Sequence, residues 1–143
     1  MGERGTPTIL HGSCVALGPA AVLILGASGT GKSALALELL SRGAVLVADD
    51  RTVIRSRDGA LFASCPSAIR GRIEARGVGI LAAETVASAR VALAVDLDQV
   101  EDQRLPPDRC LTLEGVALPL LHSTVHGHFP AAILQYLRGG RSA

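Results

Sequence analysis

This sequence has few aromatic residues, and its positive and negative charges almost balance. Its 143 residues include two Phe, one Tyr and no Trp, so Leu, Val, Ile and Ala have to fill the core. The formal net charge of +1 gives no electrostatic footprint for nucleic acid or for an anionic membrane surface. No segment is apolar over the roughly 20 residues that a membrane-spanning helix needs. We therefore expect neither nucleic acid nor a membrane as a partner.

Cysteine content and chain length bound the cellular compartment and the number of domains. The three cysteines are far apart and lack the spacing of a zinc site: Cys14, Cys65 and Cys110. Isolated cysteines of this kind are typical of reduced thiols, which predicts a cytoplasmic protein. Residues 1–143 are expected to form a single domain, because domains cluster near ~100–150 residues. Its polar ends, residues 1–7 and 138–143, are expected to be flexible.

The most informative segment has the pattern G-x-x-x-x-G-K-[ST] of a phosphate-binding loop. It is called the phosphate loop below and consists of Gly26, Ala27, Ser28, Gly29, Thr30, Gly31, Lys32 and Ser33. Residues 21–25 before it are typical of a buried strand, and residues 33–42 after it are rich in helix formers. Glycines let the backbone N–H groups of such a loop turn towards a phosphate chain, and the helix N-terminus adds its positive dipole end. We predict that Lys32 reaches the β- and γ-phosphates of a bound nucleotide and that the Ser33 hydroxyl ligates Mg²⁺.

Two adjacent carboxylates follow the next apolar run. Residues 44–48 predict a buried strand, and Asp49 and Asp50 come directly after it. Open α/β sheets place their chemistry at the carboxyl ends of such strands. One carboxylate could orient Mg²⁺ through water, and the other could take a proton from a hydroxyl nucleophile. Asp96, at the end of a predicted strand over residues 90–97, is a weaker candidate for a similar position.

Apolar periodicity and turn signals predict the remaining elements. Strands at residues 8–17 and 21–25 are expected to form one hairpin, and residues 52–55 and 60–64 another around an Asp-Gly turn. The glycine-studded segment 71–80 is either an ordinary strand or a place where backbone and a carboxylate approach a ligand. The other expected elements are a helical turn at 66–70, short strands within 111–121 and a helix at 130–137.

The histidines alone do not identify a site. A single histidine in a strand, such as His11, is usually a hydrogen-bonded structural residue. His122, His126 and His128 have a spacing that could suit a metal ion. Gly127 breaks the helix that would align them, which argues against zinc.

Four segments together resemble the catalytic domain of the HPr kinase/phosphorylase family. They are Leu10-His11-Gly12, the phosphate loop, Leu46-Val47-Ala48-Asp49-Asp50, and Ile73-Glu74-Ala75-Arg76-Gly77-Val78-Gly79-Ile80. The resemblance covers roughly residues 8–120 and implies an α/β fold of the P-loop kinase type, a mixed sheet with flanking helices. It implies an ATP- and Mg²⁺-dependent kinase that phosphorylates a serine of HPr, the phosphocarrier protein of the bacterial sugar phosphotransferase system.

The resemblance also implies roles for single residues. His11 matches the histidine that the family places beside the transferred phosphate, and Lys32 matches the lysine of its phosphate loop. Asp50 matches the general base that accepts the serine proton. Arg104, within Asp102-Gln103-Arg104-Leu105, matches an active-site arginine of the family.

The metal ligands follow in the same way. Ser33 and Glu74 match the residues that hold Mg²⁺ in the family. Asp49 is assigned to the metal as well, because one carboxylate of the pair at this strand end could orient Mg²⁺ through water.

The sequence departs from the family at two places. Full-length members carry a separate N-terminal domain, and we expect no counterpart of it in this sequence. They also contain a P-G-R-N stretch linked to dephosphorylation, where residues 119–126 read P-L-L-H-S-T-V-H. We therefore expect weak phosphorylase activity. Family members form hexamers, which predicts a homo-oligomer. Two alternatives remain open, a kinase of a small metabolite such as free serine and a regulatory module that senses nucleotide without transfer.

Overall fold

The computed structural model describes residues 7–143, so the predicted flexible leader, residues 1–7, lies outside the described residues except for Pro7. The elements, in chain order, are β1 (Thr8–Leu17), β2 (Ala20–Leu25), α1 (Lys32–Ser41), β3 (Val45–Ala48), β4 (Arg51–Arg57), β5 (Ala60–Ser64), the 3₁₀ turn η1 (Ser67–Ile69), β6 (Arg72–Ala75), β7 (Gly79–Ala82), β8 (Ser88–Val100), β9 (Cys110–Leu113), β10 (Val116–Ser123) and α2 (Phe129–Gly139). The two predicted hairpins, β1–β2 and β4–β5, are present, and α2 extends two residues beyond its predicted end. No helix in this part of the chain is long and apolar enough to cross a bilayer.

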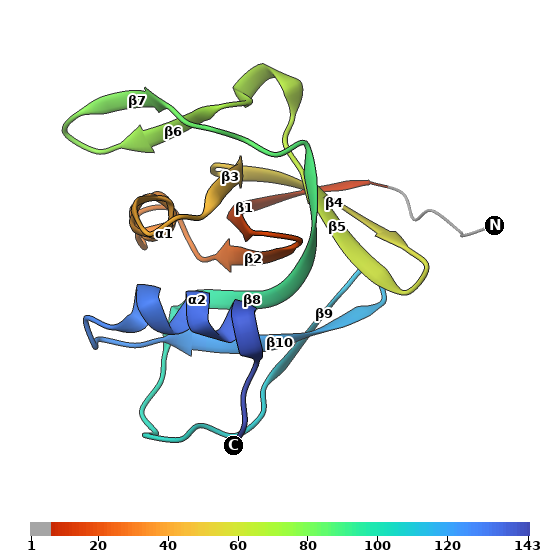
Figure 1. Ribbon diagram of the computed structural model, residues 1–143, viewed down its shortest axis with the longest axis vertical. Helices are drawn as coiled ribbons and strands as arrows, with labels where there is room; N and C mark the ends of the chain where they lie inside the picture. Colours follow the sequence, from red (N-terminus) through yellow and green to blue (C-terminus); the bar gives the residue numbers. More distant parts are fainter. Residues whose placement is uncertain (1–6) are drawn as a thin grey trace.

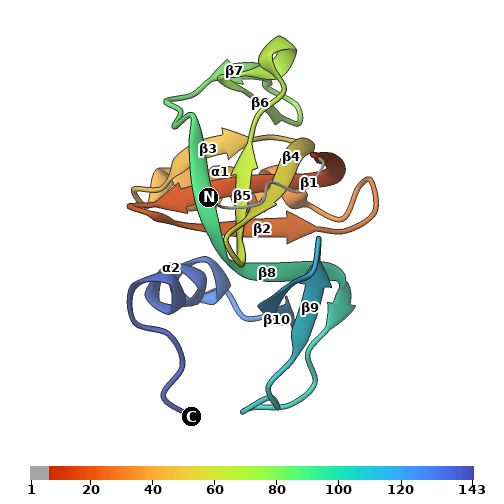
Figure 2. The ribbon, with the colours of Figure 1, turned by 90° about the vertical axis from the view of Figure 1, so that its right-hand side faces the viewer.

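The main sheet has eight strands within the described residues and is mixed, as predicted (Figure 1). Five of its strands close into a ring in the order β2-β1-β4-β5-β8. Closure is possible because β8 is long and curved: its first residues pair antiparallel with β5, and residues 90–96 pair parallel with β2. Strand β10 pairs parallel with β8 outside the ring, and β9 pairs antiparallel with β10, as Figure 2 shows from the side.

Small side chains fill the inner face of this ring. Buried residues alternate along the strands, as the period of two requires, and alanine is the commonest residue of the inner set, with five of its twelve members. The cluster also includes Val47 of β3 and Leu118 of β10 from outside the ring, and it comprises Cys14, Ala16, Ala21, Leu23, Val47, Ile54, Leu61, Ala63, Ala89, Val91, Ala94 and Leu118. A ring of so few strands has a narrow interior, which explains why alanine prevails there. Burial raises the pKa of the Cys14 thiol well above its usual range, so this cysteine stays a neutral thiol.

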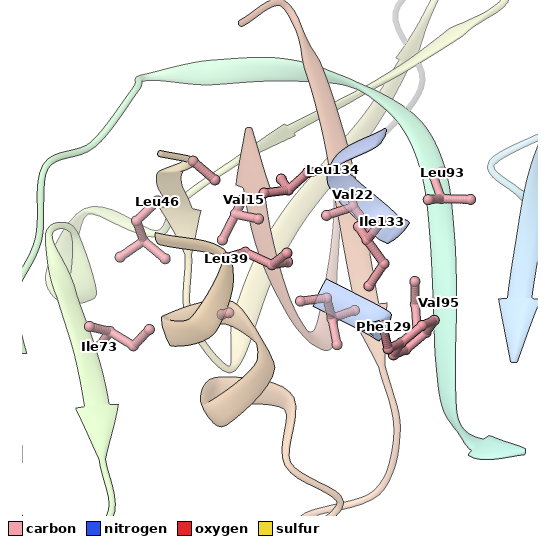
Figure 3. Close-up of a cluster of buried hydrophobic side chains, with 13 residues drawn as sticks. Val15, Val22, Leu39, Leu46, Ile73, Leu93, Val95, Phe129, Ile133 and Leu134 are labelled. Carbon is pink, nitrogen blue, oxygen red and sulfur yellow. The ribbon is translucent and has the colours of Figure 1, made fainter. Parts of the chain in front are cut away.

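The outer face of the ring is covered by α1 and α2 (Figure 3). Val22 and Ile24 of β2 point to this face, whereas Ala21 and Leu23 point inwards. Strand β2 is thus buried on both sides, which is why its sequence is continuously apolar. The predicted aliphatic core is confirmed, and Phe129 is the one aromatic residue among the buried hydrophobic residues of the described chain.

The glycine-studded segment forms a hairpin rather than one strand. Strands β6 and β7 pair antiparallel as a separate two-stranded sheet, with Gly77 at the turn. Figure 1 shows this hairpin standing apart from the main sheet and above α1. Ile73 of β6 is buried in the same cluster as Leu39 of α1, which fixes the hairpin over that helix. The hairpin therefore forms a wall next to the phosphate loop.

Candidate active site

The topology brings three sequence segments to one edge of the sheet. Strand β3 follows α1 but pairs with β1, so β1 runs antiparallel between β2 and β3. The carboxyl ends of β2 and β3 therefore meet the amino-terminal half of β1. Gly12 lies opposite Leu25 in this register, and a Cβ atom at Gly12 would stand 2.9 Å from the Ile24 carbonyl oxygen. Glycine is needed there because β1 and β2 approach closely beside the site.

The phosphate loop has the conformation that its glycines allow. Gly26, Gly29 and Gly31 adopt φ values of 153°, 85° and 98°, which a residue with a side chain rarely takes. Lys32 opens α1 and is only 6% exposed. Its ammonium donates to the carbonyl oxygens of Gly26 at 2.8 Å and of Ala27 at 3.1 Å. Lys32 is also the only lysine in the sequence, so a single ammonium side chain serves this loop.

Asp49 is the central acceptor of the site. Its Oδ1 accepts the hydroxyl protons of Ser33 at 2.7 Å and of Ser13 at 2.8 Å, and its Oδ2 accepts the N–H of Glu74 at 3.0 Å. The side chain is buried, so these bonds hold it in one place. Asp49 therefore joins the phosphate loop, β1 and the β6–β7 hairpin at one carboxylate.

Asp50 has a different environment from its neighbour. Its φ of 65° lies in the left-handed region, which residues with a side chain rarely adopt. The carboxylate is 55% exposed and lies 3.8 Å from Nδ1 of His11, which is itself 69% exposed. Its backbone N–H donates to the Ser13 hydroxyl at 3.0 Å. A non-glycine residue held in this conformation is a feature that clusters at active sites.

One cavity of about 570 Å³ unites most of the predicted site residues, although His11 is not among the residues that line it. Its lining includes Lys32, Ser33, Asp49, Asp50 and Glu74. Within residues 7–143 no three His, Cys, Asp or Glu side chains stand close enough to form a ready-made metal site. A hydroxyl with a few carboxylates nevertheless suits Mg²⁺, which keeps several waters and takes its other ligands from substrate phosphates.

Arg104 does not join this cavity. It is exposed on the loop between β8 and β9 and is absent from the residues that line the cavity. The base of that loop is closed by Arg109, whose guanidinium binds Glu101 through two bonds of 3.0 Å. Arg141 near the C-terminus adds a bond to the Pro106 carbonyl oxygen at 2.7 Å. The structure therefore does not bring Arg104 to the cavity, and its catalytic role stays a prediction.

Sequence reasoning missed two polar residues of the site. Ser13 is fully buried in β1 and connects Asp49 with the backbone of Asp50. Asp98 of β8 accepts the N–H of Ala27 at 3.0 Å and so anchors the phosphate loop. The weaker candidate, Asp96, instead accepts the N–H of Asp98. A serine directly before the apolar residues 14–17 of β1 was the available signal for the first of them.

Replacing Ser13 with Ala is expected to lower both folding stability and phosphotransfer. The change would leave the N–H of Asp50 without its acceptor, which costs about 1–3 kcal/mol of folding stability. Phosphotransfer should fall as the backbone of Asp50 loses its fixed position. Ser41→Ala is the matched control, because the Ser41 hydroxyl donates to the Glu38 carbonyl oxygen at the far end of α1. Urea denaturation and a transfer assay on both variants test this, and equal behaviour of the two would contradict it.

Known proteins resemble this chain in sequence. Residues 5–112 match the model of the HPr Serine kinase C-terminal domain. An HPr kinase/phosphorylase from Caldanaerobacter subterraneus is 46% identical over 100 residues, which are 66% of this chain and 33% of that protein. An HPr kinase/phosphorylase from Bacillus cytotoxicus is 40% identical over 116 residues, 76% of this chain and 37% of that protein. The chain thus spans about a third of the length of these curated relatives.

A solved structure extends the likeness to the whole fold. The Hpr(Ser) kinase/phosphatase from Coxiella burnetii superposes with a TM-score of 0.77 at 26% sequence identity. The match covers 92% of this chain and 94% of that one. The α/β fold predicted from the resemblance is therefore confirmed. With the family model matching most of its length, the chain belongs to the HPr serine kinase C-terminal domain family.

Proposed function

We propose that this protein is an ATP- and Mg²⁺-dependent serine kinase whose acceptor is an HPr-like phosphocarrier protein. The observation that carries the proposal is that the two carboxylates at one cavity have different environments. Asp49 is buried and fully hydrogen-bonded next to Ser33, whereas Asp50 is half-exposed beside His11. A phosphoryl transfer needs both kinds, one group that organises the phosphate side and one that reaches the incoming hydroxyl.

The proposed step transfers the γ-phosphoryl group to a serine oxygen. The acceptor Oγ forms a bond to the γ-phosphorus while the bond to the β–γ bridging oxygen breaks and ADP leaves. Asp50 takes the hydroxyl proton, and His11 lies beside it to orient the carboxylate. Lys32 and the loop amides balance the charge on the phosphates. Bound Mg²⁺ would neutralise further phosphate charge, and Ser33, Asp49 and Glu74 are the residues that would hold it.

Two features favour a protein acceptor over a free metabolite. The carboxylate of Asp50 and the ring of His11 are open to solvent, whereas a small substrate is normally enclosed. Apolar side chains also stand exposed at the cavity rim: Val78 is 75% exposed, and Ile80 follows on the same hairpin. Exposed apolar residues beside polar ones mark protein contacts.

The remaining assignments stay predictions. The homo-oligomer, expected to be the hexamer of the family, and the cytoplasmic location both rest on the sequence. Weak phosphorylase activity is predicted because residues 119–126 lack the P-G-R-N stretch. A non-catalytic nucleotide sensor is disfavoured, because such a module has no use for an exposed Asp50 beside His11.

The deciding experiment supplies labelled ATP and Mg²⁺ with three alternatives in parallel: purified HPr, free serine and no acceptor. Transfer to a serine of HPr is the expected result. Labelled phosphoserine as the sole product would establish the metabolite kinase instead. Nucleotide binding without transfer to either acceptor would leave the sensor as the function.

A further inference from the structure

A second cavity lies on the other side of the phosphate loop from the site described above. Its volume is about 320 Å³, within the usual size range of small-molecule sites. Gly31 lines both cavities, and Thr30 at the tip of the loop lines the second. A ligand whose phosphates rest on this loop can therefore extend from one cavity into the other.

The sheet topology makes this the side on which the rest of a nucleotide fits. Strands β2, β8 and β10 lie parallel and adjacent, with Leu25 opposite Asp96 and Asp96 opposite His122. Their carboxyl ends therefore share one edge, where parallel sheets bind ligands. On the other flank of β2, the ends of β1 and β3 carry His11 and the Asp49–Asp50 pair. In the proposed function the acceptor binds on the β1–β3 flank, next to Asp50. The nucleoside of ATP would then lie on the β8–β10 flank.

The lining of the second cavity has the chemistry of a base-binding site. Leu35, Leu97 and Phe129 supply apolar surface, and the hydroxyls of Thr30 and Thr124 supply polar groups. The charged residues at its end, Glu38 and Arg42, form an ion pair of 3.6 Å and so balance each other. A nucleobase has apolar faces and a polar edge, so it fits this lining better than an anion would.

This cavity has an aromatic ring in its lining, although the chain contains few aromatic side chains. The ring of His126 stacks on that of His128, with centroids 5.3 Å apart and planes inclined by 4°. His126 itself lines the cavity, and its N–H lies 3.4 Å from the Thr124 hydroxyl in the turn before α2. The imidazole face can stack on a base. This turn lies beyond residues 5–112, so the family match did not point to it.

We propose that this second cavity binds the base and ribose of the ATP whose phosphates occupy the phosphate loop, with His126 stacking on the adenine. The assignment rests on the proposed kinase function. It gives the segment between β10 and α2 a role in nucleotide selection, apart from transfer itself.

Calorimetry with Mg·ATP and with Mg·tripolyphosphate, which lacks base and ribose, tests the proposal. ATP should bind roughly 10- to 100-fold more tightly than tripolyphosphate, the range that stacking of a base supplies. His126→Ala should weaken ATP binding roughly 10-fold and leave tripolyphosphate binding unchanged. Val125→Ala is the control, because this neighbour is 86% exposed and does not line the cavity.

A spectroscopic readout separates the possible failures. The chain has only four histidines, so their ring signals can be followed by NMR. ATP, but not tripolyphosphate, should shift the signals of His126 and His128. Equal affinities for both ligands, with these signals unmoved, would overturn the cavity assignment while leaving the phosphate loop intact. Binding of neither ligand, or binding unaffected by Lys32→Met, would instead overturn the proposed function on which the assignment rests.

Discussion

Asp50→Asn is expected to lower phosphotransfer by about 10²–10⁴-fold, the usual contribution of a general base. Asparagine keeps the size and hydrogen-bonding shape of the side chain but cannot accept the serine proton. It also tolerates the left-handed backbone, which Asp50 adopts with φ of 65°. Nucleotide affinity should therefore survive, because Asp49 and Lys32 keep their contacts. Single-turnover transfer and nucleotide calorimetry on the same preparation measure the two effects separately.

The chain offers a matched control for this variant. Asp58, in the turn between β4 and β5, also has a positive φ, of 52°, and is exposed. Asp58→Asn makes the same chemical change in the same backbone conformation away from the cavity, and should leave transfer unchanged. A fully active Asp50→Asn protein would remove Asp50 from the proposed mechanism. Reduced nucleotide binding in that variant would mean that Asp50 acts on the phosphate side instead.

Removing the Lys32 ammonium is expected to have the second large effect. Lys32→Ala should weaken nucleotide binding and lower transfer by at least roughly 10²–10³-fold, as loss of a charged or hydrogen-bonding group at the reacting phosphate does. Because Lys32 is the only lysine, no neighbouring ammonium can replace it. Nucleotide calorimetry and the transfer assay measure both losses.

Lys32→Met separates the charge from the packing of the stem. Lys32 is almost fully buried and also binds the carbonyl oxygens of Gly26 and Ala27, so Lys32→Ala changes both. Methionine retains most of the buried stem and lacks the ammonium. Similar losses in both variants are the expected outcome. Unchanged ATP affinity in Lys32→Met would contradict the phosphate-loop assignment.

Local sequence patterns were sufficient for the parts of the site that are contiguous in the chain. The phosphate loop could be predicted because its glycines, Lys32 and Ser33 stand between an apolar strand and a helix. The Asp49–Asp50 pair could be predicted because it ends an apolar run. The two hairpins were predictable for the same reason, because the signals of a turn and its two strands lie within one short segment of the sequence.

The division of labour between the carboxylates could not be read from the sequence. It depends on Ser13, which reaches Asp49 only because β1 lies between β2 and β3. Pairings of this kind join distant segments, and hydrophobic periodicity carries no information on them. The same limit applies to Arg104, because its short motif matches the family while contacts of Arg109 and Arg141 decide where its loop lies.

The closure of the ring by β8 has a consequence for the order in which the chain folds. Of the five ring strands, β8 is the last to be synthesised, and its residues from Ser88 onwards must pair with β5 and β2 together. Until then both partner strands present open edges, which are templates for pairing with other chains. Pairings so distant in sequence form slowly, because the loop entropy is lost before any contact compensates it. The nascent chain is therefore most vulnerable to aggregation just before β8 emerges from the ribosome, when every residue that lines the candidate active-site cavity has already been synthesised.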